Sequence, residues 1–509
     1  MPRLEAYLCS MIRSEQEQVR LGSLQQLRDL GINPYPAEEF IVSHRSEDLR
    51  DDFKEGVEVS LAGRMMSRRI MGKASFAELK DAQGSFQLYL NRDEICPGED
   101  KTLYNSVFKK LLDRGDFIGV KGVTFLTKVG EPSVKVLEFK VLSKAIRPLP
   151  AVKTDEDGNV HDAFSDPELR YRMRYVDLCV NDKVKDTFVA RSKIIRTLRE
   201  AFDNEGWLEV DTPVLQAIPG GAAARPFATH HNALDIPLYL RIANELYLKR
   251  LIVGGFEGVY EFSRNFRNEG MDRTHNPEFT ILELYVAYKD YNWMMKTIEN
   301  LLGDVAKSVH GGKAKVVLAG QEIDFTPPYA RITMRDAILE NASVDIDKLD
   351  EDGIRSACKK LGIDVDESMG RGKLIDELFG EKCEHQYIQP TFITDYPVDM
   401  SPLTKTHRDK PGYTERFELF INGTEVANAY SELNDPIDQR ERFESQAKLA
   451  ERGDDEAMFI DQDFLRSLEF GMPPTSGVGI GVDRLVMMLT DQTSIQEVLL
   501  FPQMKPEQF

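Results

Sequence analysis

A carboxylate stands in an otherwise apolar stretch near the middle of the chain. The alternation over residues 278–288 predicts a strand that puts Phe279, Ile281, Glu283 and Tyr285 on one face. Burying an ionised glutamate among such neighbours is costly unless a cation meets it. Either an internal salt bridge or a ligand could supply that cation, and the second possibility predicts a binding site for a positively charged ligand.

Alternating glycines near the C-terminus offer a second candidate surface. In a strand, period two places Val478, Ile480 and Val482 on the core face and the glycines at 477, 479 and 481 on the other face. The bare face would let a flat ligand lie against the backbone, with Arg484 at its edge. Close packing of two strands would explain the same glycines.

A third segment combines aromatic and polar residues. Tyr260, Phe262 and Phe266 alternate with mostly polar side chains before Arg267, so one face of the predicted strand is core and the other is polar. The chain contains neither a G-x-x-x-x-G-K-[ST] phosphate loop nor a G-x-G-x-x-G dinucleotide motif. Nucleotide binding through either of these motifs is therefore excluded.

The segments that contain these residues come after an N-terminal region with a different pattern. Before residue 150, short runs at 57–61, 86–90, 117–126 and 134–142 predict strands, and a helical pattern lies between the second and third runs at Tyr104, Val107, Phe108 and Leu111. This order fits a five-stranded OB barrel, although another β-rich domain would also fit. Residues 60–150 carry 16 lysines and arginines against 10 acidic residues, in a chain of net charge -20. The local excess favours phosphate contacts by this region.

Prolines and acidic residues between 147 and 159 predict a linker. Beyond it, Phe188, Ile195, Leu198 and Phe202 form a helical stripe that ends at Gly206. Residues 331–385 have a helical and acidic character without strong strand signals, as an insertion would have. The length of 509 residues exceeds what one small module needs.

Composition bounds the class of protein. Hydrophobic residues make up 41% and charged residues 29%, which is typical of a globular protein and excludes a disordered or fibrous one. No run approaches the roughly 18 apolar residues of a membrane helix, and Glu5 interrupts the start where a signal peptide would be apolar. We therefore expect a cytoplasmic protein.

The cysteines are scattered and odd in number: Cys9, Cys96, Cys179, Cys358 and Cys383. Neither a disulfide framework nor a zinc site is therefore predicted.

Three longer segments resemble the signature motifs of class II aminoacyl-tRNA synthetases. Residues 205–213 (EGWLEVDTP) resemble motif 1, residues 266–279, which begin FRNE, resemble motif 2, and residues 479–484 (GIGVDR) resemble motif 3. The segments 219–227 (PGGAAARPF), 245–250 (ELYLKR) and 428–435 (NAYSELND) are similar to those of bacterial-type lysyl-tRNA synthetases. The similarity runs from about residue 20 to residue 503 without a large gap.

The resemblance implies an α+β architecture. An N-terminal five-stranded OB-type β-barrel would precede a class II domain built on an antiparallel sheet flanked by helices. The expected boundaries are a helical extension at 1–55, an anticodon-binding OB domain at 56–147, a linker at 148–165 and a catalytic domain at 166–509 with a helical insertion at about 331–385.

The resemblance also implies a reaction. L-lysine is activated with ATP to lysyl-adenylate, and lysine is then transferred to the 3′-terminal adenosine of tRNA(Lys). Because the amino-acid carboxylate attacks the α-phosphate, positioning and charge neutralisation suffice without a protein base. Arg267 and Arg484 are the expected catalytic residues, and the expected ATP site comprises Arg267, Glu269, His275, Asn276, Phe279 and Arg484.

A lysine side chain needs a slot that ends in a carboxylate. The residues that match the family's lysine site are Gly221, Glu245, Glu283, Tyr285, Asn428, Tyr430 and Glu432. Two positions depart from the family pattern: Asn244 stands where proline is expected, and Tyr430 replaces a phenylalanine found in many bacterial members.

Glu418 and Glu425 match the family's metal-binding acids, which implies several Mg²⁺ ions per active site. A two-residue turn at Asn422 and Gly423 would put these two acids on one face, but it would put Asn428, Tyr430 and Glu432 on the opposite one. Since the family needs all of them near one pocket, we expect a bulge or a longer turn in this hairpin.

In the N-terminal domain, Phe76, Gln87 and Glu138 match positions that meet the anticodon, where unpaired bases stack on aromatic rings. Arg68 and Arg69, with Arg64 and Lys73, are candidate phosphate contacts, although solvated surface charge explains any one of them equally well. Motif 1 implies a homodimer.

Two rival functions fit parts of the pattern. An aspartyl- or asparaginyl-type tRNA synthetase shares the domain layout, but Glu283 and Glu432 argue against an acidic or amide substrate. A non-catalytic nucleic-acid-binding paralogue would not need the complete set of Arg267, Glu269, Phe279 and Arg484.

Overall fold

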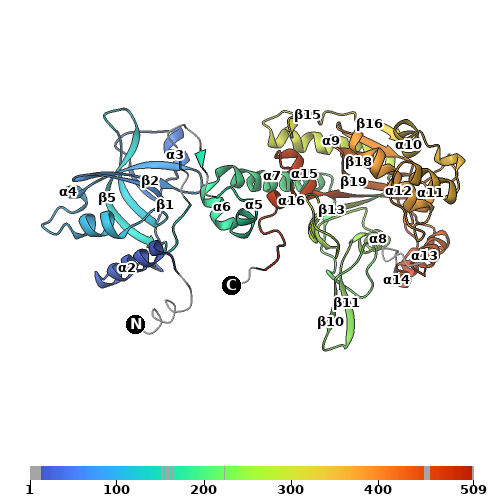
Figure 1. Ribbon diagram of the computed structural model, residues 1–509, viewed down its shortest axis with the longest axis horizontal. Helices are drawn as coiled ribbons and strands as arrows, with labels where there is room; N and C mark the ends of the chain where they lie inside the picture. Colours follow the sequence, from blue (N-terminus) through green and yellow to red (C-terminus); the bar gives the residue numbers. More distant parts are fainter. Residues whose placement is uncertain are drawn as a thin grey trace. The chain divides into compact units, whose positions relative to one another are not determined.

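The computed structural model describes residues 13–150, 153–154, 160–161, 164–222, 224–451 and 459–506. Cys9, Ala223 and most of the predicted linker between 151 and 163 lie outside the described residues. The chain divides into two compact units, Met1–Ser165 and Asp166–Phe509, each with its own core (Figure 1).

The first unit is a closed barrel with strands in the order β1-β2-β3-β5-β4, which confirms the predicted five-stranded OB-type architecture. Its strands are β1 (Glu58–Met71), β2 (Ala74–Lys80), β3 (Ser85–Asn91), β4 (Phe117–Leu126) and β5 (Pro132–Ser143). The helical segments are α2 (Glu15–Asp29), α3 (Ser46–Asp51), α4 (Arg92–Ile95) and the π-helical η1 (Leu103–Leu111). All four residues of the predicted helical stripe in η1 are buried against the barrel.

The second unit is built on an eight-stranded sheet in the order β16-β17-β18-β19-β20-β13-β12-β8. Neighbouring strands are antiparallel except in the pairs β16–β17 and β12–β8. The bounds are β8 (Leu208–Glu209), β12 (Gly258–Phe266), β13 (Glu278–Ala287), β16 (Ala330–Thr333), β17 (Thr391–Thr394), β18 (Arg416–Ile421), β19 (Thr424–Ser431) and β20 (Thr475–Gly481). The predicted antiparallel class II architecture is therefore confirmed, with parallel pairs only at its two ends.

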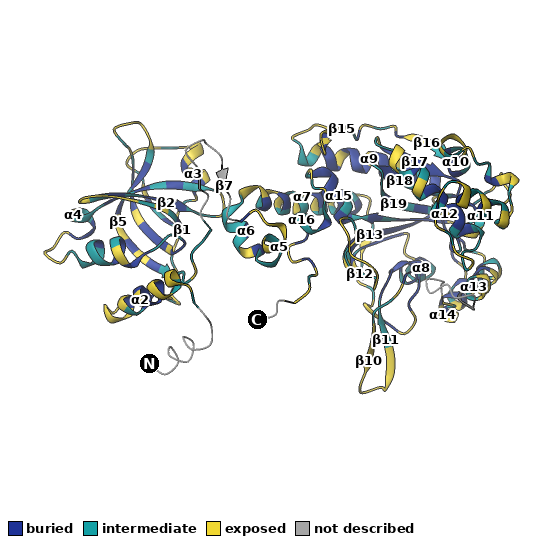
Figure 2. Cartoon of the chain, viewed as in Figure 1, coloured by how far each residue is buried: buried dark blue, intermediate teal, exposed yellow. Residues whose placement is uncertain are grey.

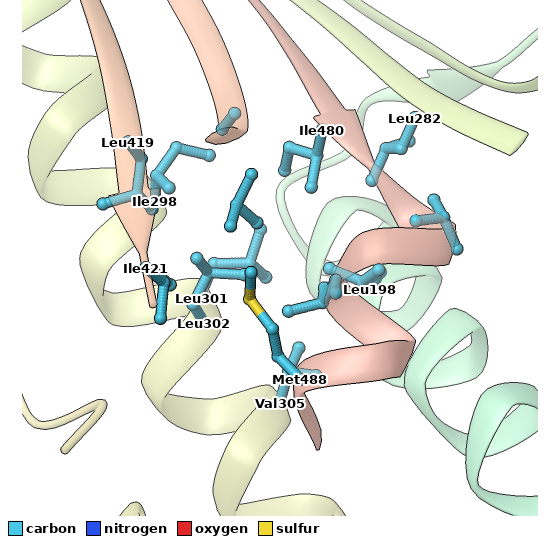
Figure 3. Close-up of a cluster of buried hydrophobic side chains, with 14 of the residues drawn as sticks. Leu198, Leu282, Ile298, Leu301, Leu302, Val305, Leu419, Ile421, Ile480 and Met488 are labelled. Carbon is cyan, nitrogen blue, oxygen red and sulfur yellow. The ribbon is translucent and has the colours of Figure 1, made fainter. Parts of the chain in front are cut away.

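Helices cover one face of this sheet. The helices α7 (Asp182–Asn204), α9 (Tyr291–Val309) and α15 (Val482–Leu489) pack there, with Leu198, Ile298 and Met488 meeting Leu282 and Ile480 from the strands (Figure 3). Period two sends the intervening residues to the opposite face. On β13, Leu282 and Leu284 face this core while Glu283 and Tyr285 face away, as predicted.

The segment 331–385 is mostly helical, as predicted, but it begins inside strand β16, which the sequence did not reveal. Ile338, Ile354 and Leu378 build a separate core that also receives Ile393 and Phe420 from the sheet. Its elements are α10 (Met334–Ala342), η2 (Ile346–Lys348), α11 (Glu351–Lys360), α12 (Arg371–Lys382) and η3 (Glu384–Gln386).

Shorter elements complete the chain. The small strands are β6 (Lys153–Thr154), β7 (Val160–His161), β9 (Leu215–Gln216), β10 (Ala228–His231), β11 (Ile236–Leu240), β14 (Lys315–Leu318) and β15 (Gln321–Asp324). The remaining helices are α5 (Pro167–Arg172), α6 (Arg174–Val180), α8 (Glu245–Val253), η4 (Val398–Met400), α13 (Pro436–Glu451), α14 (Gln462–Glu469) and α16 (Ile495–Val498). The β10–β11 hairpin is largely exposed (Figure 2). Of the helices that the structure describes, none has the length and apolar character needed to cross a membrane.

Candidate functional site

An acidic pocket lies on the polar face of the large sheet. Tyr285 donates a hydrogen bond to Glu283 Oε2 over 3.0 Å, and Tyr430 donates one to Glu245 Oε2 over 2.8 Å. Glu283 and Tyr285 come from β13, Tyr430 from β19 and Glu245 from the first turn of α8, while Glu432 directly follows β19. Sheet pairing between β13, β20 and β19 thus brings together five of the residues expected to bind lysine.

Glycines of β20 form one side of this pocket. A Cβ atom at position 477 would lie within 3.0 Å of Glu432 Oε1 and of the Tyr285 ring, and one at position 479 would lie 3.1 Å from Glu283 Oε1. Only glycine lets these carboxyl groups lie so close to the strand. The bare face expected from the glycine alternation is therefore real, and it faces acidic and phenolic groups.

Glu283 is buried without a cation in contact. In the described part of the chain its carboxyl group has no ion pair, and Tyr285 is its hydrogen-bond donor. Burial, together with the negative charge of Glu245, raises the pKa of Glu283 to about 8. Of the two explanations left open by the sequence, the internal salt bridge is not present among these residues, so a ligand cation is favoured.

The remaining residues of the expected lysine site lie around the same pocket. Gly221 has a φ of +86°, and a Cβ there would lie 3.1 Å from Ala243 and 3.3 Å from the Cβ of Glu245. Asn428 precedes Tyr430 by two positions on β19 and pairs with Gly479 of β20, so it shares their face. The loop at Gly221 therefore packs closely against the start of α8.

Asn244, which replaces the expected proline, is completely buried at the N-terminus of α8. Its side chain donates a hydrogen bond to Glu261 Oε2 over 2.9 Å and accepts one from Ser263 over 3.2 Å. Glu261 is held in turn by Arg241, whose Nη1 lies 2.6 Å from Glu261 Oε1. Hydrogen bonds to β12 therefore hold this loop in place of a proline ring.

Arg267 lies at the end of β12, beside the pocket. Its guanidinium carbon is 5.1 Å from the centroid of the Phe279 ring, and its Nε is buried without a hydrogen-bond partner. Burial lowers the pKa of Arg267, against the opposing influence of Glu425, Glu269 and Glu283, but a guanidinium stays protonated at neutral pH. A buried cation with an unused donor is suited to receive an anionic ligand.

Arg484 joins two other expected residues. Its Nη2 lies 3.2 Å from His275 Nε2, and its Nη1 donates to the main-chain oxygen of Glu425 over 2.8 Å. Because a guanidinium can only donate, Nε2 of His275 must accept, so its proton sits on Nδ1 and points to Asp272 Oδ2 at 2.8 Å. His275 and Arg484 are thus in direct hydrogen-bond contact near the start of α15, with the guanidinium as the donor.

Glu269 and Asn276 lie in the loop between β12 and β13. Glu269 accepts a hydrogen bond from the main-chain N–H of Arg225 over 3.2 Å, and Asn276 donates to the main-chain oxygen of Glu278 over 2.6 Å. Glu269 is exposed to solvent. The six residues of the expected ATP site therefore come from one strand pair, its loop and the start of α15.

The β18–β19 hairpin contains the expected bulge. Asn422 and Gly423 form a two-residue turn with φ of +51° and +67°, and the register shifts between Leu419 and Phe420, which leaves Val426 as the extra residue. Glu418 therefore faces Asn428, which donates a hydrogen bond to its Oε1 over 3.1 Å. The bulge resolves the conflict that simple alternation predicted.

Glu418 and Glu425 belong to a locally acidic region. Burial raises the pKa of Glu418 to about 8; Arg416, 2.6 Å from its Oε1, opposes the rise, and Glu425 adds to it. Burial and the charge of Glu425 also raise the pKa of Glu384 to about 7. Among the residues with described positions, no cluster of three or more acidic, histidine or cysteine side chains has the arrangement of a metal site. A divalent cation here would therefore take two protein carboxylates at most and need further oxygens from a ligand.

The outer face of the barrel carries aromatic rings. Phe76 and Tyr89 have ring centroids 5.3 Å apart, and Tyr89 and Phe125 lie 5.7 Å apart. Arg69 pairs with Phe76 in the β1–β2 register and lies 5.8 Å from its ring. Gln87 lies two residues before Tyr89 on the same face of β3. Tyr89 and Phe125, which the sequence analysis did not select, extend the predicted stacking surface.

Two predicted anticodon-domain residues are placed differently. Arg68 pairs with the buried Ala77, so it points to the inner face of the barrel, where it donates to the main-chain oxygen of Phe108. This hydrogen bond uses one nitrogen of the guanidinium, and a phosphate contact by Arg68 stays a prediction. Glu138 is exposed on β5 and lies 3.6 Å from Lys121.

Comparisons with known proteins agree with this geometry. Residues 166–505 match the family described as class II tRNA synthetases (D, K and N), and residues 59–142 match the OB-fold nucleic acid binding domain family. The lysine–tRNA ligase of Porphyromonas gingivalis is 66% identical over 499 residues, which cover 97% of this chain and 86% of the relative. Those of Christiangramia forsetii (65%; 97% and 87%) and Azobacteroides pseudotrichonymphae (62%; 97% and 99%) are similarly close.

Proposed function

The chain belongs to the lysine–tRNA ligases, a family of class II tRNA synthetases, and from this premise we propose how its residues select and activate lysine. The ligase joins L-lysine to tRNA in an ATP-dependent reaction. The observation that carries the site assignment is the acidic cluster itself. Glu283 and Glu432 lie against the glycine face of β20, and Glu245 joins them through Tyr430 and Lys249. Among the described residues, Glu283 has no ion-pair partner. A substrate with a side-chain ammonium would supply it.

Each pocket residue has a proposed task. Glu283, Tyr285 and Glu432 receive the side-chain ammonium of lysine, which suits an acidic slot of buried oxygens. Glu245, Asn428 and the backbone at Gly221 orient the α-amino and α-carboxylate groups, with Tyr430 lining the slot. An aspartate or asparagine substrate would meet like charge or unpaired carboxylates here, which argues against the aspartyl- and asparaginyl-type alternative.

For activation, we propose that Arg267 bridges the lysine carboxylate and the α-phosphate of ATP. Its unused buried donor and its position between Glu283 and Glu425 support this task. Phe279 stacks on the adenine ring, and Glu269 and Asn276 contact the nucleotide. His275 and Arg484, which are in hydrogen-bond contact with each other, hold the β- and γ-phosphates. This set of positioned cations argues against a non-catalytic paralogue.

We propose that Glu418 and Glu425 hold Mg²⁺. The mutual repulsion of these partly exposed carboxylates supports a cation at this place, and a hard divalent ion prefers carboxylate and phosphate oxygens. With two protein carboxylates available, the ions would take the rest of their ligands from ATP and water. Bound Mg²⁺ would neutralise phosphate charge during adenylate formation, and Arg416 and Asn428 orient Glu418 for that task.

The pH dependence of lysine affinity tests this pocket. Glu283 has a pKa of about 8 in the empty pocket, so below that pH it is mostly protonated, and lysine binding must release the proton. We expect affinity for lysine to rise with pH, by up to about ten-fold per unit between pH 6 and 8. Isothermal titration calorimetry of the wild type and of Glu283→Gln measures this. The substitution should weaken binding and flatten the profile; a flat wild-type profile would contradict the assignment.

We propose that the first unit recognises the tRNA anticodon, with Phe76, Gln87 and Glu138 near the bases and Arg69 near the backbone. The aromatic surface beside Arg69 supports this.

For the domains, we propose a helical extension at 1–55, the OB domain at 56–147, a linker at 148–165 and the catalytic domain at 166–509 with its insertion at about 331–385.

Phe76→Ala should separate charging from activation. Stacking of one base on an aromatic ring is worth about 1–3 kcal/mol, so lysylation of tRNA at limiting tRNA should fall roughly ten-fold or more. Lysine-dependent ATP–pyrophosphate exchange needs no tRNA and should stay near the wild-type rate. Equal loss of both activities would mean that Phe76 only maintains the fold.

We propose a homodimer in the cytoplasm. Apolar side chains near motif 1 are exposed in the single chain, namely Val189, Leu208, Val214, Leu215 and Ile218, and such a surface suits a two-fold interface. Analytical ultracentrifugation should give a dimer of the 57.9 kDa chain. An active species that sediments as a monomer would rule this out.

A further inference from the structure

Lys249 lies inside the acidic pocket, although no substrate role requires a protein lysine there. Its side chain is completely buried on α8. Its ammonium lies 2.5 Å from Glu245 Oε1, one helical turn earlier, and is ion-paired with Glu432 Oε2, which comes from the end of β19. Lys249 therefore links two pocket acids that come from different elements.

In Glu245 and in Glu432, the second carboxylate oxygen does not contact Lys249. Glu245 Oε2 accepts the hydrogen bond from Tyr430, whereas Glu432 Oε1 is buried without a hydrogen-bond partner and lies next to Gly477. A buried carboxylate oxygen without a partner carries an unmet desolvation cost. It is therefore available to a ligand ammonium, while the oxygens on the other side are occupied by Lys249.

The surroundings hold the Lys249 ammonium in one place. It lies 5.6 Å from the centroid of the Tyr430 ring and 5.9 Å from that of Phe464, so aromatic faces cover the sides that the acids leave open. With both acids ion-paired to this fixed charge, neither carboxylate can turn freely. A second ammonium is also repelled from the space between Glu245 and Glu432, which directs it toward Glu283 and Glu432 Oε1.

The positive charge of Lys249 also compensates part of the negative charge of the pocket carboxylates. Three carboxyl groups in one buried pocket would take up protons if nothing compensated their charge, and the attraction for an ammonium would then be lost. Burial by itself lowers the pKa of Lys249, but Glu245 and Glu432 raise it above its ordinary value. Lys249 thus stays charged, and its ammonium opposes the rise that burial causes in the pKa of Glu432.

We propose that Lys249 is a positioning residue for substrate selection: by bridging Glu245 and Glu432 it fixes both carboxylates and cancels part of their charge, so that the empty pocket matches a ligand with one side-chain ammonium. This inference rests on the proposed lysine site. It adds that a resident lysine, which touches no reacting atom, holds two of the substrate-binding carboxylates in place before the substrate enters.

Substitution of Lys249 tests the proposal. Lys249→Met should raise the KM for lysine in ATP–pyrophosphate exchange by about ten-fold or more and change kcat little. Lys249→Arg keeps the charge and should bring the KM back toward the wild-type value. A folded Lys249→Met protein, as judged by its melting curve and its ATP affinity, with the wild-type KM for lysine would refute the proposal. If the wild type showed no lysine-dependent exchange, the proposed function itself would fail.

Discussion

Arg267→Ala is expected to lower kcat/KM for lysine-dependent ATP–pyrophosphate exchange by on the order of 100-fold or more, equivalent to about 3 kcal/mol of transition-state stabilisation. The reason is that Arg267 is a half-buried, permanently charged group whose buried Nε has no hydrogen-bond partner, and it lies near both Glu283 and the proposed phosphate-binding residue Arg484. Removing it leaves the charge that develops between the lysine carboxylate and the α-phosphate without its partner. Steady-state exchange kinetics measure the loss.

Arg264 provides a matched control on the same strand. It lies three residues before Arg267, but its side chain is exposed and its contact with Glu278 is a 3.8 Å surface ion pair. Such pairs contribute little, so Arg264→Ala should exchange at close to the wild-type rate. Similar losses in the two variants would show that general damage to β12, rather than loss of the bridging cation, explains the effect.

Gly477→Ala is expected to damage lysine binding selectively. The new methyl group would lie within 3.0 Å of Glu432 Oε1 and the Tyr285 ring, which cannot both move away because Glu432 is ion-paired with Lys249 and Tyr285 is fully buried. Overpacking of this kind costs about 1–3 kcal/mol, so the KM for lysine should rise on the order of 10- to 100-fold.

The control is Gly98→Ala, since a Cβ at that position meets nothing within 4 Å and its φ is not in the left-handed region. It should leave exchange unchanged. A Gly477→Ala enzyme with the wild-type KM for lysine would mean that the glycine face of β20 does not border the substrate.

The faces of the central strands could be predicted from sequence because period two is strictly kept on β13 and β20. The alternation alone was enough to predict that Leu282 and Leu284 lie on the core face of β13 and that Glu283 and Tyr285 lie on the opposite face. A bulge or longer turn in the β18–β19 hairpin was expected only because the site residues must share one face. Its position at Val426 could not be predicted, because Asn422 and Gly423 fit a tight turn and nothing in the local residues marks the extra position.

Other features depend on long-range contacts. Lys249 looked like one more helix residue, although its spacing of four from Glu245 was a usable signal; its contact with Glu432 bridges segments that are distant in sequence. The orientation of Arg68 could not be predicted because β1 is irregular between Met65 and Ser67, and this bulge changes which residues of β1 face the barrel interior. Tyr89 was overlooked as a stacking ring because its partner Phe76 lies on another strand.

The most direct measurement of the central claim is Mg²⁺-dependent ATP–pyrophosphate exchange by the wild-type protein with each of the twenty amino acids in turn. If Glu283, Tyr285 and Glu432 receive the side-chain ammonium, L-lysine alone should support rapid exchange, and omission of Mg²⁺ should abolish it. Exchange with aspartate or asparagine but not with lysine would contradict the account.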